Sequence, residues 1–449
     1  MVDCFRANMA ISADTDIPTK RGFVKASELK VGDIVYDIDG NETQITRVEE
    51  CSLDFRIKFN FGATEDILVS PEQILVGYVG SKCGAVEKDG LPQYITAIEV
   101  FSLSAEGYLT KFIPVTVQGS GRLEIDPWLL GLWLGDGSKR CSCIATHVDD
   151  LNFIIDQISK AGYGVGAIRH DTRNNQKGAS VNIRDGFKQQ LRDLNLINNK
   201  HIPETVFGLE KGYRIEILRG LIDSDGNIEK QRGRVNFTNT NYNLAIGCAR
   251  LASSLGELVH ISSRDVIGFG RKCHAFMIGW TPIIMPVRLP RKVSMFKGRK
   301  VIEKRTSVHS EFHISLSDDS LMGHEIETES GTLVATNYYI PIGAGHQGEI
   351  SRDTANKLLL SMDSARTFSE DKHQIKESIK NCSPVDYKIQ ELLRFRQPCD
   401  RTKREILIDD RLYKGYQAAA KAIGCSVNTI SRAIAAGKNT VWGHSFSAK

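Results

Sequence analysis

The feature that most constrains the fold is an internal repeat in the middle of the chain. Two apolar, glycine-bearing segments, residues 127–137 and 217–226, both end in Asp-Gly. After each Asp-Gly pair the sequence reads as a strand-like segment, a helix and further strands. The repeat predicts two halves of similar structure, each of which begins with an apolar helix.

The spacing of small residues predicts that these two helices pack against each other. Gly131 and Gly135 lie four residues apart on one helix face, and Gly220 and Ser224 repeat that spacing. Small side chains on one face allow two helix backbones to approach closely. Large apolar neighbours would then anchor each helix to its own half.

Residues that favour helix ends predict where the two helices begin and end. Asp126 can cap the first helix, and Pro127 suits its first turn. Gly137 and Gly226 follow the last helical residues, so we expect both helices to end in left-handed turns.

Helices packed in this way would bring Asp136 and Asp225 together at one end of the pair. Adjacent carboxylates repel unless they share a proton or a cation, and Mg²⁺ takes oxygen ligands of this kind. A metal ion held there could activate water and stabilise the leaving oxygen of a phosphodiester. One acid from each half also fits a substrate with two strands to cut. Asp136 and Asp225 are therefore the predicted catalytic and metal-binding residues.

At these residues the chain resembles the LAGLIDADG homing endonucleases, in the form that carries two motifs on one chain. The second copy, residues 218–226, departs from the nine-letter pattern at Arg219 and Ser224. The first copy has Leu130 for the first Ala, and residues 133–135 read Trp-Leu-Gly in place of Ile-Asp-Ala.

The resemblance covers residues 120–305. It implies a saddle of two αββαββα halves whose sheets lie in the major groove of DNA. It also implies Mg²⁺-dependent cleavage across the minor groove of a long double-stranded target.

The family also carries a lysine near the metal ions. Residues 200–203 read Lys-His-Ile-Pro and resemble the lysine-x-Ile-Pro block of intein-borne endonucleases, which implies that Lys200 is that lysine. In the second half we favour Lys292, in Leu-Pro-Arg-Lys, over Lys272.

A basic run extends from residue 288 to residue 305. Its place beside the second half favours contact with DNA phosphates over a merely solvated edge. The expected contacts are Arg288, Arg291, Lys297, Arg299 and Lys300.

Strand-rich segments flank the repeat. Residues 1–118 read as short strands that include an Asp-Gly turn, and residues 306–347 form a strand-rich piece too short to fold alone. The second segment should complete the first. Residues 119–305, with halves 119–210 and 211–305, would then be an insertion in a β module.

This β module resembles the Hint fold of inteins. The matching residues are Asp14-Thr15, Gly22, 28–35 and 70–73 for the N-terminal blocks, and 324–347 for the C-terminal blocks. An endonuclease inserted between such blocks is the usual arrangement of large inteins.

Splicing chemistry needs groups that this module lacks. Ala10 stands where a cysteine or serine should begin the intein, and Gln73 replaces the histidine of the Thr-x-x-His block. His346-Gln347 best matches the terminal His-Asn pair, and Gly348 offers no nucleophile. We expect that the module does not splice, either as a natural relic or as an engineered precursor trap, and that it could contact DNA instead.

The C-terminal segment, residues 403–449, reads as helix, glycine turn and helix between short strands. It resembles the NUMOD-type DNA-binding repeats of phage homing endonucleases. The second helix has an apolar stripe and a polar face suited to a major groove, for which a solvated helical hairpin is the alternative. The expected DNA contacts are Ser426, Asn428, Thr429, Ser431 and Arg432. Residues 348–402 are a linker or a further DNA contact.

The composition bounds the remaining possibilities. The chain has 449 residues, a hydrophobic fraction of 41% and a net charge of +4, which fits a globular protein of several domains. No apolar stretch approaches the about 20 residues that span a bilayer, and we expect a monomeric, cytoplasmic protein of phage or microbial origin. Two other functions stay open: a protein-splicing precursor, and a DNA binder or RNA maturase that does not cleave.

Overall fold

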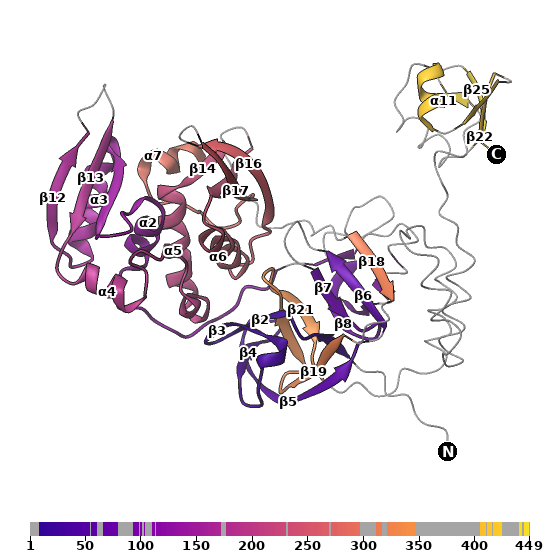
Figure 1. Cartoon of the computed structure of the whole chain (residues 1–449), viewed down its shortest axis with the longest axis horizontal. Helices are drawn as coiled ribbons and strands as arrows, with labels where there is room; N and C mark the ends of the chain where they lie inside the picture. Colours follow the sequence, from indigo (N-terminus) through magenta and orange to yellow (C-terminus); the bar gives the residue numbers. More distant parts are fainter. Residues whose placement is uncertain are drawn as a thin grey trace. The chain divides into compact units, whose positions relative to one another are not determined.

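The computed structural model describes most of the chain up to residue 345 and parts of the C-terminal segment. The described residues are 9–53, 55–60, 66–79, 93–97, 99–100, 103, 110–112, 114–171, 177–229, 232–268, 271–296, 311–316, 321–345, 405–409, 411–414, 416–423, 440–441 and 444–448. The chain divides into two compact units, Met1–Arg352 and Asp353–Lys449, and each is described by itself (Figure 1).

A β module is built from strands at both ends of the first unit. The strands before the repeat are β1 (Ala10–Ser12), β2 (Asp16–Thr19), β3 (Gly22–Lys25), β4 (Ile34–Tyr36), β5 (Glu42–Ser52), β6 (Phe55–Asn60), β7 (Asp66–Val69), β8 (Ile74–Val79), β9 (Gln93–Thr96) and β10 (Thr110–Lys111), with a short 3-10 helix η1 (Ala26–Glu28). The strands after it are β18 (Glu311–Leu316), β19 (Met322–Thr328), β20 (Thr332–Ala335) and β21 (Ile340–Gly343).

The late strands share sheets with the early ones. The nine-stranded sheet has the order β18-β6-β7-β1-β19-β5-β4-β2-β3, and in the five-stranded sheet β21 lies between β8 and β20. His324 of β19 pairs with Ile11 of β1, and Ile342 of β21 pairs with Leu75 of β8. The intervening segment is therefore an insertion in the β module.

The insertion consists of two halves. The first half contains α2 (Pro127–Asp136), β11 (Cys143–His147), α3 (Val148–Lys160), β12 (Val165–His170), β13 (Gly178–Ile183), α4 (Phe187–Asp193) and η2 (Glu204–Gly208). The second half contains α5 (Lys211–Ser224), β14 (Gly226–Glu229), β15 (Arg234–Asn239), α6 (Tyr242–Ser253), β16 (His260–Gly268), β17 (Arg271–Trp280), α7 (Pro290–Val293) and η3 (Ser294–Phe296).

The two halves follow one plan with one difference. The second half has a four-stranded antiparallel sheet in the order β14-β15-β17-β16, and its elements follow the αββαββα order that the resemblance implied. The first half has three strands in the order β11-β13-β12. An isolated bridge between Gly137 and Ile144 takes the place of its first strand.

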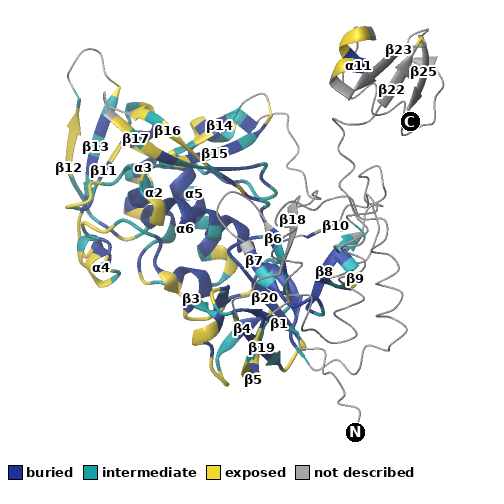
Figure 2. Ribbon diagram, turned by 45° about the vertical axis from the view of Figure 1, so that its right-hand side comes forward, coloured by how far each residue is buried: buried dark blue, intermediate teal, exposed yellow. Residues whose placement is uncertain are grey.

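Helices α2 and α5 lie side by side at the centre of the insertion, and α5 is largely buried (Figure 2). The expected cap is present, since Asp126 accepts a hydrogen bond of 2.8 Å from the Leu129 amide. A Cβ placed on Gly131 would strike the carbonyl of Ile217, and one placed on Gly220 would lie 2.5 Å from the Leu132 nitrogen. The small residues thus permit backbone contact between the helices, as the spacing predicted.

The prediction of left-handed turns after these helices was wrong. Gly137 has an extended backbone with φ −72° and ψ 148°, and Gly226 begins β14 rather than a left-handed turn. Both glycines are needed for space instead. A Cβ on Gly137 would meet the carbonyl of Trp133, and one on Gly226 would lie 2.6 Å from Cα of Ile222.

The second unit contains a small antiparallel sheet and a helix. Its elements are β22 (Glu405–Ile408), β23 (Arg411–Lys414), α11 (Tyr416–Ile423), β24 (Thr440–Val441) and β25 (His444–Ala448), and the sheet order is β23-β22-β25-β24. The first helix of the expected helix-turn-helix is α11, and the second lies outside the described residues. Among the described residues, no helix is long and apolar enough to cross a membrane.

Candidate active site

The two acids of the repeat meet where α2 and α5 end. Asp136 is the last residue of α2, and Asp225 directly follows α5. Their carboxyl groups are hydrogen-bonded to each other, and burial raises the pKa of both above the ordinary value. For Asp136, repulsion by the Asp225 carboxylate raises the pKa further. Asn239 of β15 also donates to Asp225 at 3.5 Å.

Lys200 reaches the acid pair from the segment between α4 and η2. Its Nζ donates to the carbonyl of Gly135 at 2.8 Å and lies 5.2 Å from the centre of the Trp133 ring. Burial lowers the pKa of Lys200, while the carboxylates of Asp225 and Asp136 oppose that shift. The structure therefore places this ammonium group beside both acids.

Lys292 reaches the same place from α7. Its Nζ donates to the carbonyls of Ile222, Ser224 and Gly226 at 2.5, 3.1 and 2.7 Å. Burial lowers the pKa of Lys292, and acidic neighbours, Asp136 among them, oppose that shift. Lys272 is instead exposed on β17, opposite Ile267 in the hairpin.

The two lysines are related by the repeat. Gly135 precedes Asp136 just as Ser224 precedes Asp225. Each lysine binds the carbonyl directly before the acid of its own half. The site is therefore a pseudo-symmetric pair of acids flanked by two lysines, of which Lys292 is buried and Lys200 half-buried.

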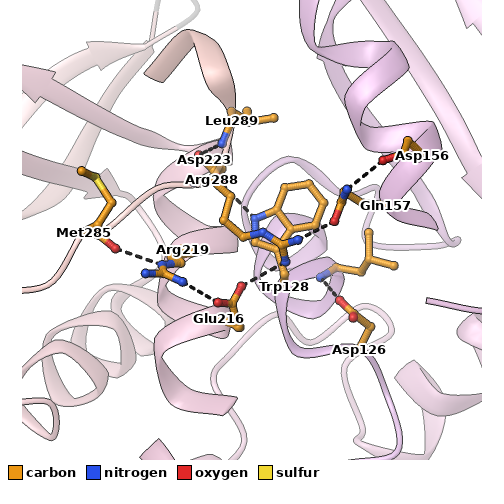
Figure 3. Close-up of polar contacts among 11 residues, drawn as sticks. Asp126, Trp128, Asp156, Gln157, Glu216, Arg219, Asp223, Met285, Arg288 and Leu289 are labelled. Carbon is orange, nitrogen blue, oxygen red and sulfur yellow. Dashed lines mark hydrogen bonds and ion pairs between the residues drawn. The ribbon is translucent and has the colours of Figure 1, made fainter. Parts of the chain in front are cut away.

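Asp223, two residues before the acid of the second half, is buried and binds across the halves (Figure 3). It accepts hydrogen bonds from the Trp128 indole at 2.8 Å and from the amides of Arg288 and Leu289 at 2.9 and 3.1 Å. Burial raises its pKa to about 6, against the effect of these donors. The first half has Leu134 at the equivalent position.

Arg288 and Arg291 have partners within the insertion. The Arg288 guanidinium binds Glu216 at 3.0 Å and Gln157, and lies 4.9 Å from the centre of the Trp128 ring (Figure 3). Arg291 forms a bidentate pair with Asp150 at 2.7 and 3.0 Å. Both arginines therefore join the two halves, and their contact with phosphates stays a prediction.

Each sheet of the insertion also has a polar face, which was not among the features predicted from the sequence. On β15, Arg234 and Asn236 alternate with fully buried residues, and a Cβ on Gly279 would lie 2.7 and 2.9 Å from their side chains. On β13, Ser180 and Asn182 alternate with buried residues in the same way. Because side chains alternate across a strand, this pattern in the sequence could have revealed both faces.

Of the remaining predicted positions, Ala10 and Gln73 lie within the described residues. Ala10 is buried, and its amide donates to Ser70 Oγ at 3.1 Å. The buried Gln73 side chain donates to the carbonyls of Gly343 at 2.9 Å and Ile74 at 3.0 Å. The other positions lie outside the described residues: Lys297, Arg299, Lys300, His346, Gln347, Ser426, Asn428, Thr429, Ser431 and Arg432.

The acid pair fits a divalent cation. Two neighbouring carboxylates repel unless they share a proton or a cation, and Mg²⁺ is commonly held by one or two carboxylates together with substrate phosphates and water. In the described part of the chain, no group of three or more His, Cys, Asp or Glu side chains is placed to hold a metal ion. Asp136 and Asp225 would therefore supply two protein ligands and leave other positions for water and phosphate.

Comparison with known proteins places part of this site in a family. Residues 212–279 match the LAGLIDADG-like domain family, so this part of the second half is similar to LAGLIDADG-like domains. The replicative DNA helicase DnaB of Mycobacterium intracellulare is 23% identical over 278 residues, which are 58% of this chain. They cover 44% of the helicase, so the chain spans less than half the length of this curated relative.

Three solved structures are similar to parts of the chain. Mesophilic variants of the homing endonuclease I-DmoI show 16% identity over 38% of this chain and 93% of theirs, with a TM-score of 0.24. An I-DmoI variant with its target DNA and Mg shows 15% identity over 40% of this chain and 97% of its own, with a TM-score of 0.25. The N-terminal LAGLIDADG domain of DUF199/WhiA shows 9% identity over 39% of this chain and 85% of its own, with a TM-score of 0.25.

Proposed function

We propose that the chain is a site-specific DNA endonuclease of the homing type, which makes double-strand breaks by metal-dependent hydrolysis. The observation that carries this proposal is the contact between Asp136 and Asp225 at the ends of two crossing helices. A lone carboxylate has structural explanations, but two in contact, each beside a lysine, repel each other unless a cation or substrate uses them.

Asp136 and Asp225 would hold Mg²⁺ or another divalent cation. When bound, the metal supplies Lewis-acid stabilisation of the developing charge and lowers the pKa of water. Lys200 and Lys292 would keep their ammonium groups beside the scissile phosphates, where positive charge stabilises the transition state. One acid and one lysine per half match the two strands of a duplex.

The polar faces of the two sheets would contact the DNA. Arg234 and Asn236 of β15, and Ser180 and Asn182 of β13, carry groups that can bind phosphates and base edges. The predicted contacts at Arg288, Arg291, Lys297, Arg299 and Lys300 stay part of this proposal, although Arg288 and Arg291 also have partners within the insertion.

The β module would be a Hint-like domain without splicing activity. Ala10 has no nucleophilic side chain, and the Gln73 amide is bonded to backbone carbonyls. The C-terminal unit would add DNA contacts through the helix-turn-helix residues Ser426, Asn428, Thr429, Ser431 and Arg432. We further propose that the protein acts as a monomer in the cytoplasm, because both catalytic halves are on one chain.

The test is cleavage of a randomised duplex library with Mg²⁺ by wild type, Asp225→Asn and Asp193→Asn. Asp193 is exposed on α4, so its variant is the matched control for loss of a carboxylate. We expect discrete double-strand breaks from wild type and from the control, and none from Asp225→Asn or in the presence of a chelator. Selective retention of some duplexes without any cleavage would favour a non-cleaving DNA binder or a maturase.

A further inference from the structure

We propose that each active-site lysine is positioned by the opposite half of the insertion, Lys292 by Asp150 of α3 and Lys200 by Asn241 at the start of α6. Both would be positioning residues that act through the lysines. The inference rests on the proposed endonuclease function and concerns how the rates at the two DNA strands are controlled.

The segment that carries Lys292 packs on the first half. Arg291, its neighbour in α7, is bound by both oxygens of Asp150, and the Asp150 side chain is 3% exposed. Upstream, Arg288 lies over the Trp128 ring and binds Gln157, and both of these residues belong to the first half (Figure 3). The amides of Arg288 and Leu289 also bind Asp223 of their own half, but α7 is only one turn long, so the contacts to the first half help to determine where its backbone lies.

The segment that carries Lys200 packs on the second half. The carbonyl of Lys200 accepts a hydrogen bond of 2.6 Å from Nδ2 of Asn241. Two residues later, Ile202 packs against Gly247 of α6 so closely that a Cβ on Gly247 would lie 3.0 Å from Cβ of Ile202. Helix α6 occupies the same place in the second half as α3 in the first. The exchange is therefore reciprocal.

The ammonium groups of the two lysines, unlike their backbone segments, bind within their own halves. Both ammonium groups bind carbonyls of their own half, at Gly135 for Lys200 and around Ser224 for Lys292. Each lysine thus bridges the halves, because the opposite half contributes to holding its backbone segment while its ammonium group binds within its own half. A misplacement of about 1 Å at a catalytic group can cost about 100-fold in rate. Loss of one anchor should therefore slow the strand served by that lysine and spare the other strand.

Substitutions of Asn241 can separate the two functions of its side chain. Its Oδ1 caps α6 by accepting from the amides of Asn243 and Leu244, while its Nδ2 binds Lys200. Asp and Ser are also good helix caps, so Asn241→Asp and Asn241→Ser keep the cap and remove the donor. On the other side, Asp150→Asn keeps the shape of the side chain and removes the charge that binds Arg291.

The experiment measures single-turnover cleavage of each strand of an end-labelled target duplex by the full-length protein. Lys200→Met and Lys292→Met first establish which strand depends on which lysine. We expect Asn241→Asp and Asn241→Ser to slow the Lys200-dependent strand about 10-fold or more, within the range for misplaced groups. Asp150→Asn should slow the Lys292-dependent strand to a similar extent. Duplex nicked in only one strand should accumulate with each set of variants, and the strand that stays intact should differ between the two sets.

The possible results are distinguishable. Equal slowing of both strands by the anchor variants, or a strand bias that does not follow the partner lysine, would overturn the inference. If wild type cuts no duplex, it is the proposed endonuclease function that fails. Thermal unfolding and DNA binding of each variant check its folding, and Arg291→Gln replaces Asp150→Asn if the latter does not fold.

Discussion

Gly131 and Gly220 face each other where the two central helices cross. A Cβ on Gly131 would strike the Ile217 carbonyl and lie 3.0 Å from Cα of Gly220. The obstacles are backbone atoms, which cannot move aside as a flexible side chain could. Backbone contact at these two positions is what brings Asp136 and Asp225 together.

Gly131→Ala should therefore destabilise the first unit by about 2 kcal/mol or more, because overpacking a tight contact costs about 1–3 kcal/mol. Gly212→Ala is the matched control. Gly212 lies in the first turn of α5 with open space around it, so alanine should be neutral or stabilise by up to about 1 kcal/mol. Urea unfolding of the two variants measures the difference, and equal midpoints would contradict the close-contact interpretation.

At the residue scale, the sequence pointed to Asp136, Asp225, Lys200 and Lys292, and the structure brings these four side chains together. The repeat made this possible, because equivalent positions in two copies must converge if the copies pack together. The intramolecular role of Arg291 could not be predicted in the same way. Its partner is Asp150, far away in the sequence, and only the packing of α7 on α3 shows that the charge is already paired.

At the scale of elements, each sheet of the insertion has one apolar and one polar face. Val235 and Phe237 of β15 are fully buried, and Arg234 and Asn236 lie on the other face over Gly279. The alternation of strand side chains makes such faces readable from sequence. The bounds of the strands were harder to predict, because the first half replaces a whole strand with the single bridge at Gly137.

We expect that Arg234→Ala and Asn236→Ala weaken DNA binding in different ways. Loss of a phosphate contact at Arg234 should lower affinity for all duplexes and reduce the slope of log K against log salt by about 1. Loss of a base contact at Asn236 should cost about 1–3 kcal/mol and relax specificity at one target position. Fluorescence anisotropy over a salt series and a panel of target variants measures both effects.

The control for these variants is Lys211→Ala. Lys211 is the exposed first residue of α5, at the opposite end of that helix from Asp225. Its loss should leave affinity, salt slope and specificity close to those of wild type. A control that weakened binding as much as Arg234→Ala would count against the sheet face as the DNA-contacting surface.

At the scale of the first unit, two arginines of the insertion bind the β module. Arg250 of α6 pairs with Asp16 at 3.0 Å and lies 4.3 Å from the centre of the Phe23 ring. Arg214 of α5 is fully buried and donates to carbonyls of Leu209, Ser254 and Val117. Val117 belongs to the buried core cluster of the β module, so α5 is joined directly to that core.

Arg214→Met should therefore lower the stability of both modules together. The substitution keeps most of the side-chain volume but leaves buried carbonyls without donors, and hydrogen bonds to a charged group contribute about 1.5–3 kcal/mol each. We expect a loss of about 3 kcal/mol or more in the free energy of unfolding. Hydrogen exchange followed by mass spectrometry should show β5 and α5 becoming less protected by the same amount, because cooperative units open together.

Arg122→Ala tests whether this effect belongs to the buried contact. Arg122 also pairs with a residue beside α5, Glu210, but its side chain is 74% exposed. Solvent screens an exposed pair, which contributes little to stability, so protection in both modules should stay close to that of wild type. If Arg214→Met loosened α5 and left β5 unchanged, the β module and the insertion would be independent folding units. Arg214 would then stabilise only its own half.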